Sequence, residues 1–178
     1  MGNSELNVVY QDEHIVAIYK PPGLLVHRSP IDKHETRFAV QLLRDQLGRH
    51  VYPLHRLDRP TAGLLLFALD SETASVMNAQ MMSNGMQKSY QALVRGYVKS
   101  AGMIDYALKY RWDKYADADR TKQVVPQSAH SDYWPLAHYE LPFAVGRYNT
   151  ARYSWLGLTP HTGRKHQLRR HMLHLRHP

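Results

Sequence analysis

Short apolar runs bounded by turn residues recur along the first half of the chain, and runs of this length are typical of strands. The expected strands cover residues 8–10, 15–20, 51–54 and 64–68. Apolar residues at helical spacing predict a helix over about 36–47, with Gly48 at its C-terminal end. Asp70 or Ser71 is expected to cap a second helix that continues to Met82.

The second half of the chain has a weaker pattern. Residues 88–95 alternate like a strand, and residues 102–108 are expected to pair with them. Residues 109–135 are polar and without clear periodicity, which predicts a long loop or insertion. A final strand at 152–158 precedes a basic helix from about 165 to 175. Strands that mostly follow one another, with a few helices, predict an α+β fold with a largely antiparallel sheet.

Composition describes an ordinary globular chain with a surplus of basic residues. Of its 178 residues, 43% are hydrophobic and 21% are charged, so we expect one domain with a single core. Lys and Arg number 23 against 15 Asp and Glu, which gives a net charge of +8. That surplus suits a polyanionic partner, although a basic protein without such a partner has the same composition.

Several common signals are missing from the sequence. The absence of Cys excludes disulfides, thiolate catalysis and Cys-ligated zinc. No P-loop, G-x-G-x-x-G or G-x-S-x-G motif occurs, so nothing points to a nucleotide cofactor or a serine nucleophile. The N-terminus lacks a signal-peptide layout, and the longest strongly apolar run, 64–69, is too short to span a bilayer. We therefore expect a cytoplasmic protein that needs no cofactor.

Residues 55–63, His-Arg-Leu-Asp-Arg-Pro-Thr-Ala-Gly, place one carboxylate, Asp58, between Arg56 and Arg59. Neighbouring guanidinium groups favour the ionised form of a carboxylate, which suits a nucleophile or an ion-pair partner. The proline and glycine of this segment predict a turn that leads into the following strand. An Asp in a surface turn that accepts backbone hydrogen bonds would show the same local pattern. Local chemistry alone leaves both interpretations open.

This segment resembles a signature of the RluA family of pseudouridine synthases, H-R-L-D-x-x-T-[SA]-G. The Asp of that signature is catalytic, so the resemblance implies catalysis by Asp58. Lys88-Ser89-Tyr90 is similar to the family's K-x-Y segment, whose Tyr lies against the target base, which implies that role for Tyr90. On spacing alone, a Tyr in a strand is more often a core residue.

Residues 162–169 are similar to a third family motif, T-G-R-x-H-Q-[IL]-R. Its last Arg pairs with the catalytic Asp, which implies that Arg169 pairs with Asp58. A solvated basic helix packed by its leucines is the alternative interpretation. The side chains expected to contact RNA, by filling the space of a flipped base or by holding phosphates, are Arg56, Arg59, Arg164, Lys165 and Arg170.

Histidines gather near the C-terminus and raise the question of a metal site. They are His161, His166, His171, His174 and His177. No H-E-x-x-H motif and no carboxylate lies within this cluster, and the neighbouring Lys and Arg would repel a cation. We therefore expect no metal, and phosphate contacts or an ordinary surface instead.

The resemblance runs nearly end to end and is weakest over residues 109–141. It implies the pseudouridine synthase fold, and segments 26–29, 44–48 and 163–171 are most similar to the branch that modifies uridine 65 of tRNA. Family members continue past a His-Pro like the one that ends this chain, so we expect residues 1–178 to form one catalytic domain without its C-terminal part. Expected partners are RNA, in particular tRNA, with the chain as a monomer. The alternatives are a ribosomal RNA synthase or an inactive RNA-binding fragment.

Overall fold

The computed structural model describes residues 5–28, 34–83, 85–110 and 125–178. The chain divides into two compact units, with the boundary between Gly85 and Met86. Unit 1 is used here for the described residues before that boundary and unit 2 for those after it, and each is described by itself. None of the described helices is long and apolar enough to cross a membrane.

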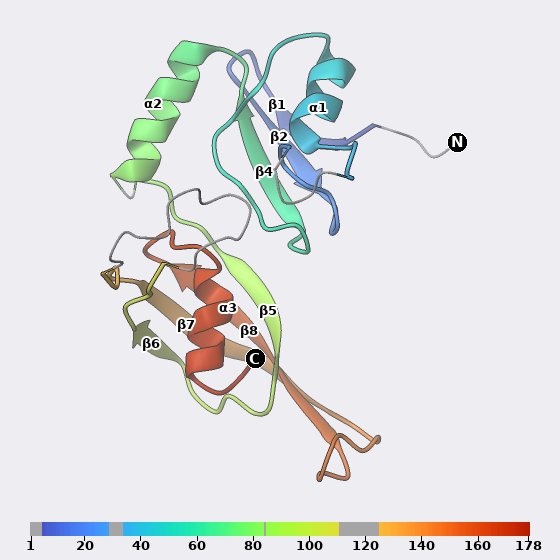
Figure 1. Ribbon diagram of the computed structural model, residues 1–178, viewed down its shortest axis with the longest axis vertical. Coiled ribbons are helices and arrows are strands. Elements are labelled where there is room, and N and C mark those ends of the chain that lie inside the picture. The colour runs from blue at the N-terminus through green and yellow to red at the C-terminus, as the bar shows by residue number, and fades with distance from the viewer. Residues whose placement is uncertain (1–4, 29–33, 84, 111–124) are drawn as a thin grey trace. The chain divides into compact units, whose positions relative to one another are not determined.

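Unit 1 contains a four-stranded antiparallel sheet with the order β1-β2-β4-β3 and two helices (Figure 1). Its elements are β1 Asn7–Gln11, β2 Ile15–Lys20, α1 Ala39–Leu47, β3 Tyr52–Pro53, β4 Gly63–Ala68 and α2 Ser71–Met82. The central strands β2 and β4 pair from Ile15↔Ala68 to Lys20↔Gly63. Several of their apolar side chains, such as Ile18 and Phe67, are completely buried, so the loops at the ends of these strands start from a rigid base.

Unit 2 contains a second antiparallel sheet, with the order β5-β8-β7-β6, and one helix. Its elements are β5 Tyr90–Arg95, β6 Gly102–Asp105, β7 His130–Leu141, β8 Ala151–Pro160 and α3 Gln167–His174. One face of the sheet packs against α3 through a buried cluster that includes Val94, Leu156, Leu158 and Met172 (Figure 1). Burial of this apolar surface holds the helix on the sheet.

The α+β class and the antiparallel pairing are confirmed, and most of the expected elements are present. Gly48 ends α1 in the left-handed conformation, with φ of 64°, as expected for a helix C-terminus. Asp70 caps α2, because its Oδ1 accepts a hydrogen bond of 2.7 Å from the Thr73 backbone N–H. The described strands form two separate four-stranded sheets, whereas the sequence analysis expected one sheet.

Two expectations for the second half are wrong. Residues 102–105 pair with β7, and β5 pairs with β8, so the predicted pairing of 88–95 with 102–108 does not form. The predicted loop at 109–135 overlaps β7, which begins at His130. Pro135 argued against a strand here, because proline has no backbone N–H to donate to a sheet. In the structure, Pro135 lies where the register between β7 and β8 is irregular, and such a position tolerates the missing donor. Residues 111–124 of the predicted loop lie outside the described residues.

Candidate active site

Asp58 lies on the loop between β3 and β4, which the sequence motif predicted, and its side chain is half-buried. The loop is anchored on one side of the acid by the buried side chain of Leu57. On the other side, the Thr61 N–H donates to the Asp58 carbonyl oxygen at 2.9 Å, which closes a turn. Gly63 then begins β4. The carboxylate therefore projects from a short, constrained loop next to a central strand of the sheet.

A buried lysine ties this loop to the end of β2. The Lys20 side chain is fully buried, and its Nζ donates to the carbonyl oxygens of Leu24 at 2.8 Å, Pro21 at 3.0 Å and Arg59 at 3.2 Å. Burial lowers the pKa of Lys20, and the Asp58 carboxylate opposes this by favouring the cation. Lys20 thus satisfies three carbonyl groups and supplies a positive charge close to the candidate catalytic acid.

Backbone contacts join the same two loops. The Gly23 N–H donates to the Arg59 carbonyl oxygen at 2.8 Å, and the Arg59 Nε donates to the Gly23 carbonyl oxygen at 3.2 Å. The Arg59 guanidinium also forms an ion pair with Glu35. Arg56 is exposed. Of the two arginines that flank Asp58, Arg59 therefore contributes to holding the loop and Arg56 presents its charge at the surface.

In unit 2, the third motif forms the turn that precedes α3. The helix begins at Gln167, two residues later than expected, because His166 adopts a left-handed conformation with φ of 54°. A positive φ is costly for a residue other than glycine and persists only where surrounding contacts impose it. The turn therefore has a single defined path, and the contacts that impose it converge on the Gln167 side chain.

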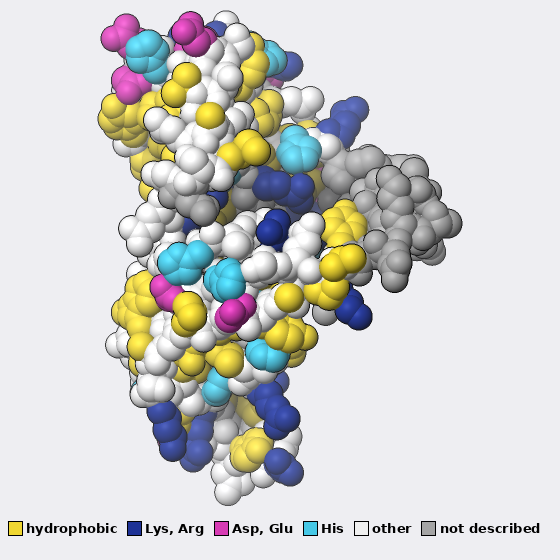
Figure 2. Space-filling model, turned by 90° about the vertical axis from the view of Figure 1, so that its left-hand side faces the viewer, with side chains coloured by type: hydrophobic (Ala, Val, Ile, Leu, Met, Phe, Trp, Pro, Cys, Tyr) yellow, Lys and Arg dark blue, Asp and Glu magenta, His cyan; other side chains and the backbone are white. Residues whose placement is uncertain are grey.

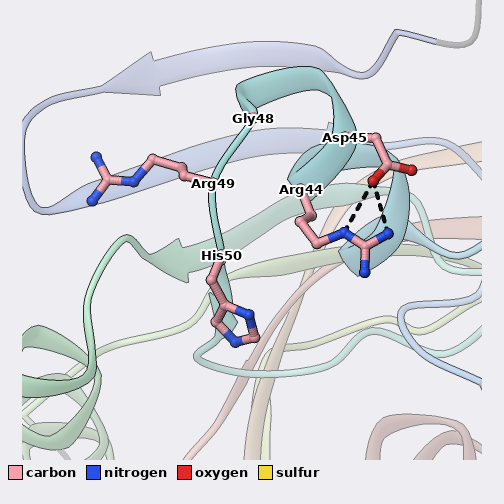
Figure 3. Close-up of a pocket in the computed structure, with 5 residues that line it drawn as sticks. All are labelled: Arg44, Asp45, Gly48, Arg49 and His50. Atoms are coloured by element: carbon pink, nitrogen blue, oxygen red, sulfur yellow. Dashed lines mark hydrogen bonds and ion pairs between the residues drawn. The ribbon is translucent and has the colours of Figure 1, made fainter.

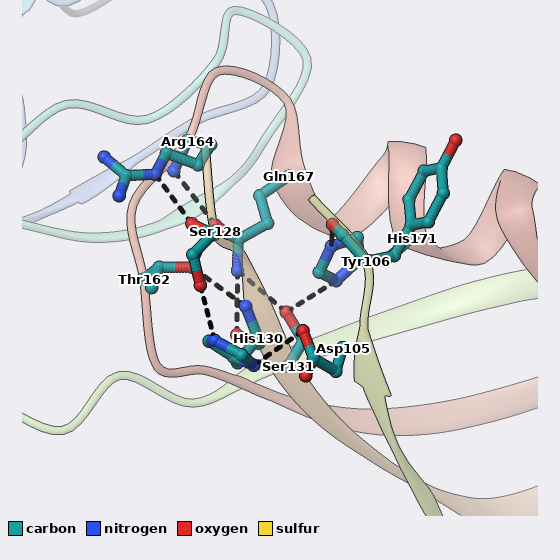
Figure 4. A network of polar contacts seen from close by, with 9 residues as sticks. All are labelled: Asp105, Tyr106, Ser128, His130, Ser131, Thr162, Arg164, Gln167 and His171. Atoms are coloured by element: carbon teal, nitrogen blue, oxygen red, sulfur yellow. Dashed lines mark hydrogen bonds and ion pairs between the residues drawn. The ribbon is translucent and has the colours of Figure 1, made fainter. Parts of the chain in front are cut away.

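The Gln167 amide links the turn to strand β7 (Figure 4). Its Oε1 accepts from the Thr162 hydroxyl at 2.7 Å and from the Arg164 N–H at 3.0 Å. Its Nε2 donates to the His130 carbonyl oxygen and to the Ser131 Oγ, both at 2.9 Å. All four hydrogen-bonding positions of the amide are thus in use, which fixes both its orientation and that of the turn.

His171, one helical turn further along α3, completes the buried network (Figure 4). Its Nδ1 lies 3.0 Å from Ser131 Oγ and its Nε2 lies 3.2 Å from the Tyr106 carbonyl oxygen. A carbonyl oxygen only accepts, so Nε2 carries the proton and Nδ1 accepts from the Ser131 hydroxyl. This arrangement requires neutral His171, and burial lowers the pKa of its imidazole accordingly.

The structure assigns the remaining predicted site residues to unit 2. Tyr90 is the first residue of β5 and packs partly against the apolar cluster under α3. Arg169 is exposed on α3, two residues from both Gln167 and His171 and so on the side of the helix opposite to them. Asp58 belongs to unit 1, so the pairing of Asp58 with Arg169 and the contact of Tyr90 with a base stay predictions.

The basic residues around α3 have distinct structural contacts. Arg164 is exposed and its Nε donates to the Ser128 carbonyl oxygen at 3.1 Å. Arg170 donates from its guanidinium to the Lys109 carbonyl oxygen at 2.8 Å. Lys165 is half-buried, with its Nζ 5.9 Å from the centre of the Tyr110 ring. These contacts hold the three cations in place, and their binding to RNA stays a prediction.

The C-terminal histidines have separate partners. His161 Nε2 lies 2.7 Å from an Asp132 carboxylate oxygen, and the His174 ring stacks on Tyr106 with 3.8 Å between centroids. His177 Nδ1 lies 2.8 Å from the Arg95 carbonyl oxygen. Over the described ranges, no group of three or more His, Asp or Glu side chains is arranged to hold a metal ion.

A cavity of about 460 Å³ lies at the end of α1 and is lined by Arg44, Asp45, Gly48, Arg49 and His50 (Figure 3). Arg44 is bound to Asp45, with Nη2 and Oδ1 2.8 Å apart, and Arg49 donates to the Leu69 carbonyl oxygen. Figure 3 shows Arg49 and His50 directed away from the Arg44–Asp45 pair. These side chains do not converge on one point, so the cavity gives no anion site.

The residues that hold the Asp58 loop and the turn before α3 were not predicted as site residues from the sequence. They are Lys20, Ser131, Gln167 and His171. The available signal for Lys20 was a charged residue at the end of an otherwise apolar strand. Gln167 was present in the third motif, but its role depends on the four atoms around it. Ser131 lay in the segment interpreted as a loop.

Comparison with protein families gives a match to the model for RNA pseudouridylate synthases over residues 14–174. The chain is 54% identical over 178 residues to tRNA pseudouridine synthase C of Vibrio parahaemolyticus and 56% identical over 173 residues to that of Pasteurella multocida. These alignments cover 100% and 97% of this chain but 72% and 71% of the two relatives. The chain thus corresponds to a little over two thirds of each relative.

Solved structures agree with the sequence comparison. Human RNA pseudouridylate synthase domain containing 1 superposes with a TM-score of 0.75 at 26% identity, over 100% of this chain and 69% of that one. Human RNA pseudouridylate synthase domain containing 4 gives a TM-score of 0.65 at 26% identity, over 93% and 63%. The expected fold is therefore confirmed.

Proposed function

The chain belongs to the RNA pseudouridylate synthase family, and from this premise we propose that it converts a uridine of tRNA to pseudouridine, at position 65. The Asp58 loop carries the proposal. One half-buried carboxylate projects from a constrained turn, with a buried lysine behind it, at the position of the family's catalytic Asp. A catalytic carboxylate has to be ionised and precisely placed, and this loop supports both requirements.

The reaction is an isomerisation. The N1–C1′ bond of uridine breaks, the base turns, C5 joins C1′, and the proton lost from C5 is balanced by one gained at N1. Atoms and electrons balance without an oxidant, a reductant or a group donor, so the expectation of no cofactor fits the chemistry. A uridine stacked in folded RNA is inaccessible and must be flipped out, which costs on the order of a few kcal/mol.

The proposed roles follow the three motifs. Asp58 acts at the ribose, either by attacking C1′ or by removing a ribose proton to form a glycal. Arg169 pairs with Asp58 and keeps it ionised and oriented. Tyr90 stacks on the uracil and assists removal of the C5 proton. Arg56 occupies the space left by the flipped base, and phosphates are held by Arg59, Arg164, Lys165 and Arg170.

The choice of tRNA is supported by the names of the relatives and by the charge of the chain. The relatives above are named tRNA pseudouridine synthase C, and segments 26–29, 44–48 and 163–171 resemble the same branch. A net charge of +8 favours binding to a polyanion that is read through its shape and phosphates. We also propose that the protein works in the cytoplasm as a monomer.

Two alternative functions give different results in the same assays. A ribosomal RNA synthase would share the reaction but modify a ribosomal uridine. An inactive RNA-binding fragment would bind RNA without making pseudouridine. The second alternative is relevant because the chain spans little more than two thirds of its relatives.

The experiment is to map pseudouridine in tRNA and ribosomal RNA from cells with and without the gene, and in RNA treated with the purified chain. We expect loss of pseudouridine at position 65 in a subset of tRNAs and its restoration by the chain. If pseudouridine is lost at a ribosomal position alone, the substrate is ribosomal RNA and not tRNA, and the proposed reaction still holds. If the purified chain binds RNA but forms no pseudouridine, the chain is an inactive RNA-binding fragment.

A further inference from the structure

The free end of the β7–β8 hairpin extends beyond the rest of its sheet (Figure 1). The pairing of β7 with β8 continues to Leu141 and Ala151, whereas β5 pairs with β8 only between Tyr153 and Leu158. At about 3.3 Å per residue, this end lies roughly 30 Å along β8 from Pro160, the strand end that leads toward α3. The hairpin is therefore long enough to reach a second part of a large ligand that is bound near the turn preceding α3.

The tip of the hairpin has a defined turn that presents an arginine. Val145 and Tyr148 exchange backbone hydrogen bonds of 2.9 and 3.2 Å, and Gly146 supplies the positive φ of 60° that the turn needs. The Arg147 guanidinium lies over the Tyr148 ring, 5.2 Å from its centre, and donates to the Tyr148 hydroxyl at 3.0 Å. The tip thus presents a paired cation and aromatic ring.

A polar cluster braces the hairpin just before this turn. Glu140 accepts from the Thr150 hydroxyl at 2.6 Å, the Tyr97 hydroxyl at 2.8 Å and the Arg152 Nε at 3.1 Å. These three donors, the Thr150 hydroxyl first, lower the pKa of Glu140 to about 2. The Glu140 carboxylate is therefore occupied by three donors within the sheet. Residues 142–150 contain no acidic side chain that would offset the charge of Arg147.

Aromatic side chains are exposed around the same turn. Phe143 is 51% and Tyr148 is 58% exposed, and Tyr139 on β7 is also exposed. Figure 2 shows Lys and Arg side chains together with apolar ones at this end of the hairpin. A small sheet gains nothing from exposing several aromatic residues to water, so such a group indicates a contact surface.

We propose that the hairpin end, comprising Phe143, Arg147 and Tyr148, is a second RNA-contacting surface that binds the tRNA away from the reacting uridine. The proposal rests on the proposed function, which places Arg169, near the start of α3, beside the reacting uridine. Arginine with neighbouring aromatic rings suits phosphates and the faces of bases or riboses. The single sign of charge at the tip and the overall charge of +8 favour RNA over a protein partner of mixed charge.

The experiment measures the Kd of the purified chain for two transcripts, a full-length tRNA and its isolated T-arm stem–loop. The variants are Arg147→Gln, Tyr148→Ser, and Arg44→Gln as the control, an exposed arginine paired with Asp45. For the full-length tRNA, we expect Arg147→Gln and Tyr148→Ser each to raise Kd about tenfold. Arg147→Gln should also reduce the salt slope of binding by about one. The stem–loop lacks the other arms of the tRNA, which are the parts that the tip is proposed to contact, so its Kd should not change.

Each other outcome has a definite meaning. Equal weakening for the tRNA and the stem–loop would overturn the second surface, because the tip would then act near the reacting site. Unchanged binding of the full-length tRNA would also overturn it, as would an equal loss in Arg44→Gln. A wild-type chain that binds tRNA without forming pseudouridine would overturn the proposed function, and the Kd differences would still decide the role of the hairpin.

Discussion

The loop that carries Asp58 in unit 1 is held by a buried cation, whereas the turn before α3 in unit 2 is held by a chain of neutral side chains. Lys20 gathers three carbonyl groups around one ammonium group. In unit 2, neutral side chains form a chain of hydrogen bonds that runs from Gln167 through Ser131 to His171. It ends at the Tyr106 carbonyl oxygen. Both arrangements fix an irregular segment at the end of a sheet strand, where the backbone lacks partners of its own.

The difference follows from what each segment has to satisfy. The Asp58 loop and the segment after β2 offer carbonyl oxygens, which need donors, and an ammonium group provides three of them. The turn before α3 offers a hydroxyl and an N–H, and β7 offers the His130 carbonyl oxygen. This set needs both an acceptor and a donor, and an amide provides both. A charged anchor also acts on the nearby carboxylate, which a neutral anchor does not.

The largest expected effect concerns the two side chains that the anchored segments present. Asp58→Asn should lower turnover by at least about a thousandfold without weakening RNA binding, because the change removes a charge and keeps the shape. Arg169→Ala should lower turnover about a hundredfold, because it removes the proposed partner of that charge. The measurement is pseudouridine formed per unit time in tRNA.

The control for the second change is Arg170→Ala, which alters a neighbour on the same helix that contacts the Lys109 carbonyl oxygen. An equal loss of turnover in both arginine variants would contradict the proposed ion pair between Arg169 and Asp58. Retained turnover in Asp58→Asn would remove the acid from the chemistry altogether.

The charged anchor is tested by Lys20→Met. This change removes the Lys20 donor from the carbonyl oxygens of Pro21, Leu24 and Arg59, and of these the Arg59 oxygen keeps its hydrogen bond from the Gly23 N–H. The free energy of unfolding should therefore fall by about 2 kcal/mol. Urea denaturation of the variant and of Lys99→Met, an exposed lysine in unit 2, measures the difference. If the two variants have the same midpoint, Lys20 is not an anchor.

The neutral anchor is tested by a matched pair of serines in unit 2. Ser131 and Ser154 are both fully buried, and each hydroxyl makes two hydrogen bonds. Ser131→Ala and Ser154→Ala should each cost about 1 kcal/mol of unfolding free energy. Only Ser131→Ala should also slow pseudouridine formation, because only Ser131 holds the turn before α3. Parallel effects on turnover would reduce Ser131 to a core residue.

The smallest expected effect separates the anchors by pH. Burial lowers the pKa of both His171 and Lys20, so in each case the unfolded chain binds more protons between the folded and the ordinary pKa, and stability rises with pH there. For His171 this range lies below 6.5, so unfolding free energy should fall as the pH drops below 6.5. For Lys20 it lies below 10.5.

His171→Gln should therefore flatten the acid side of the stability profile, and Lys20→Met should flatten the alkaline side. Urea denaturation of wild type and both variants across the pH range measures both slopes. An acid slope that is unchanged in His171→Gln would show that His171 is not held neutral in the fold.

The sequence by itself determined the local structure of unit 1 and the positions of the three motifs. Apolar runs gave β2 and β4 almost to the residue, Asp70 gave the start of α2, and Gly48 gave the end of α1. These features depend on neighbours in the chain, such as the hydrogen bond from the Thr73 N–H to Asp70, so local reasoning is sufficient.

The tertiary structure alone decided which strands pair and which polar residues act as anchors. Alternation shows that a strand has a buried face, but its partner depends on contacts distant in sequence, so the pairing of β5 with β8 was not predictable. Lys20 and His171 have their roles because of atoms up to 65 residues away, such as the Tyr106 carbonyl oxygen. A buried polar side chain takes its function from its partners, and only folding brings those partners to it.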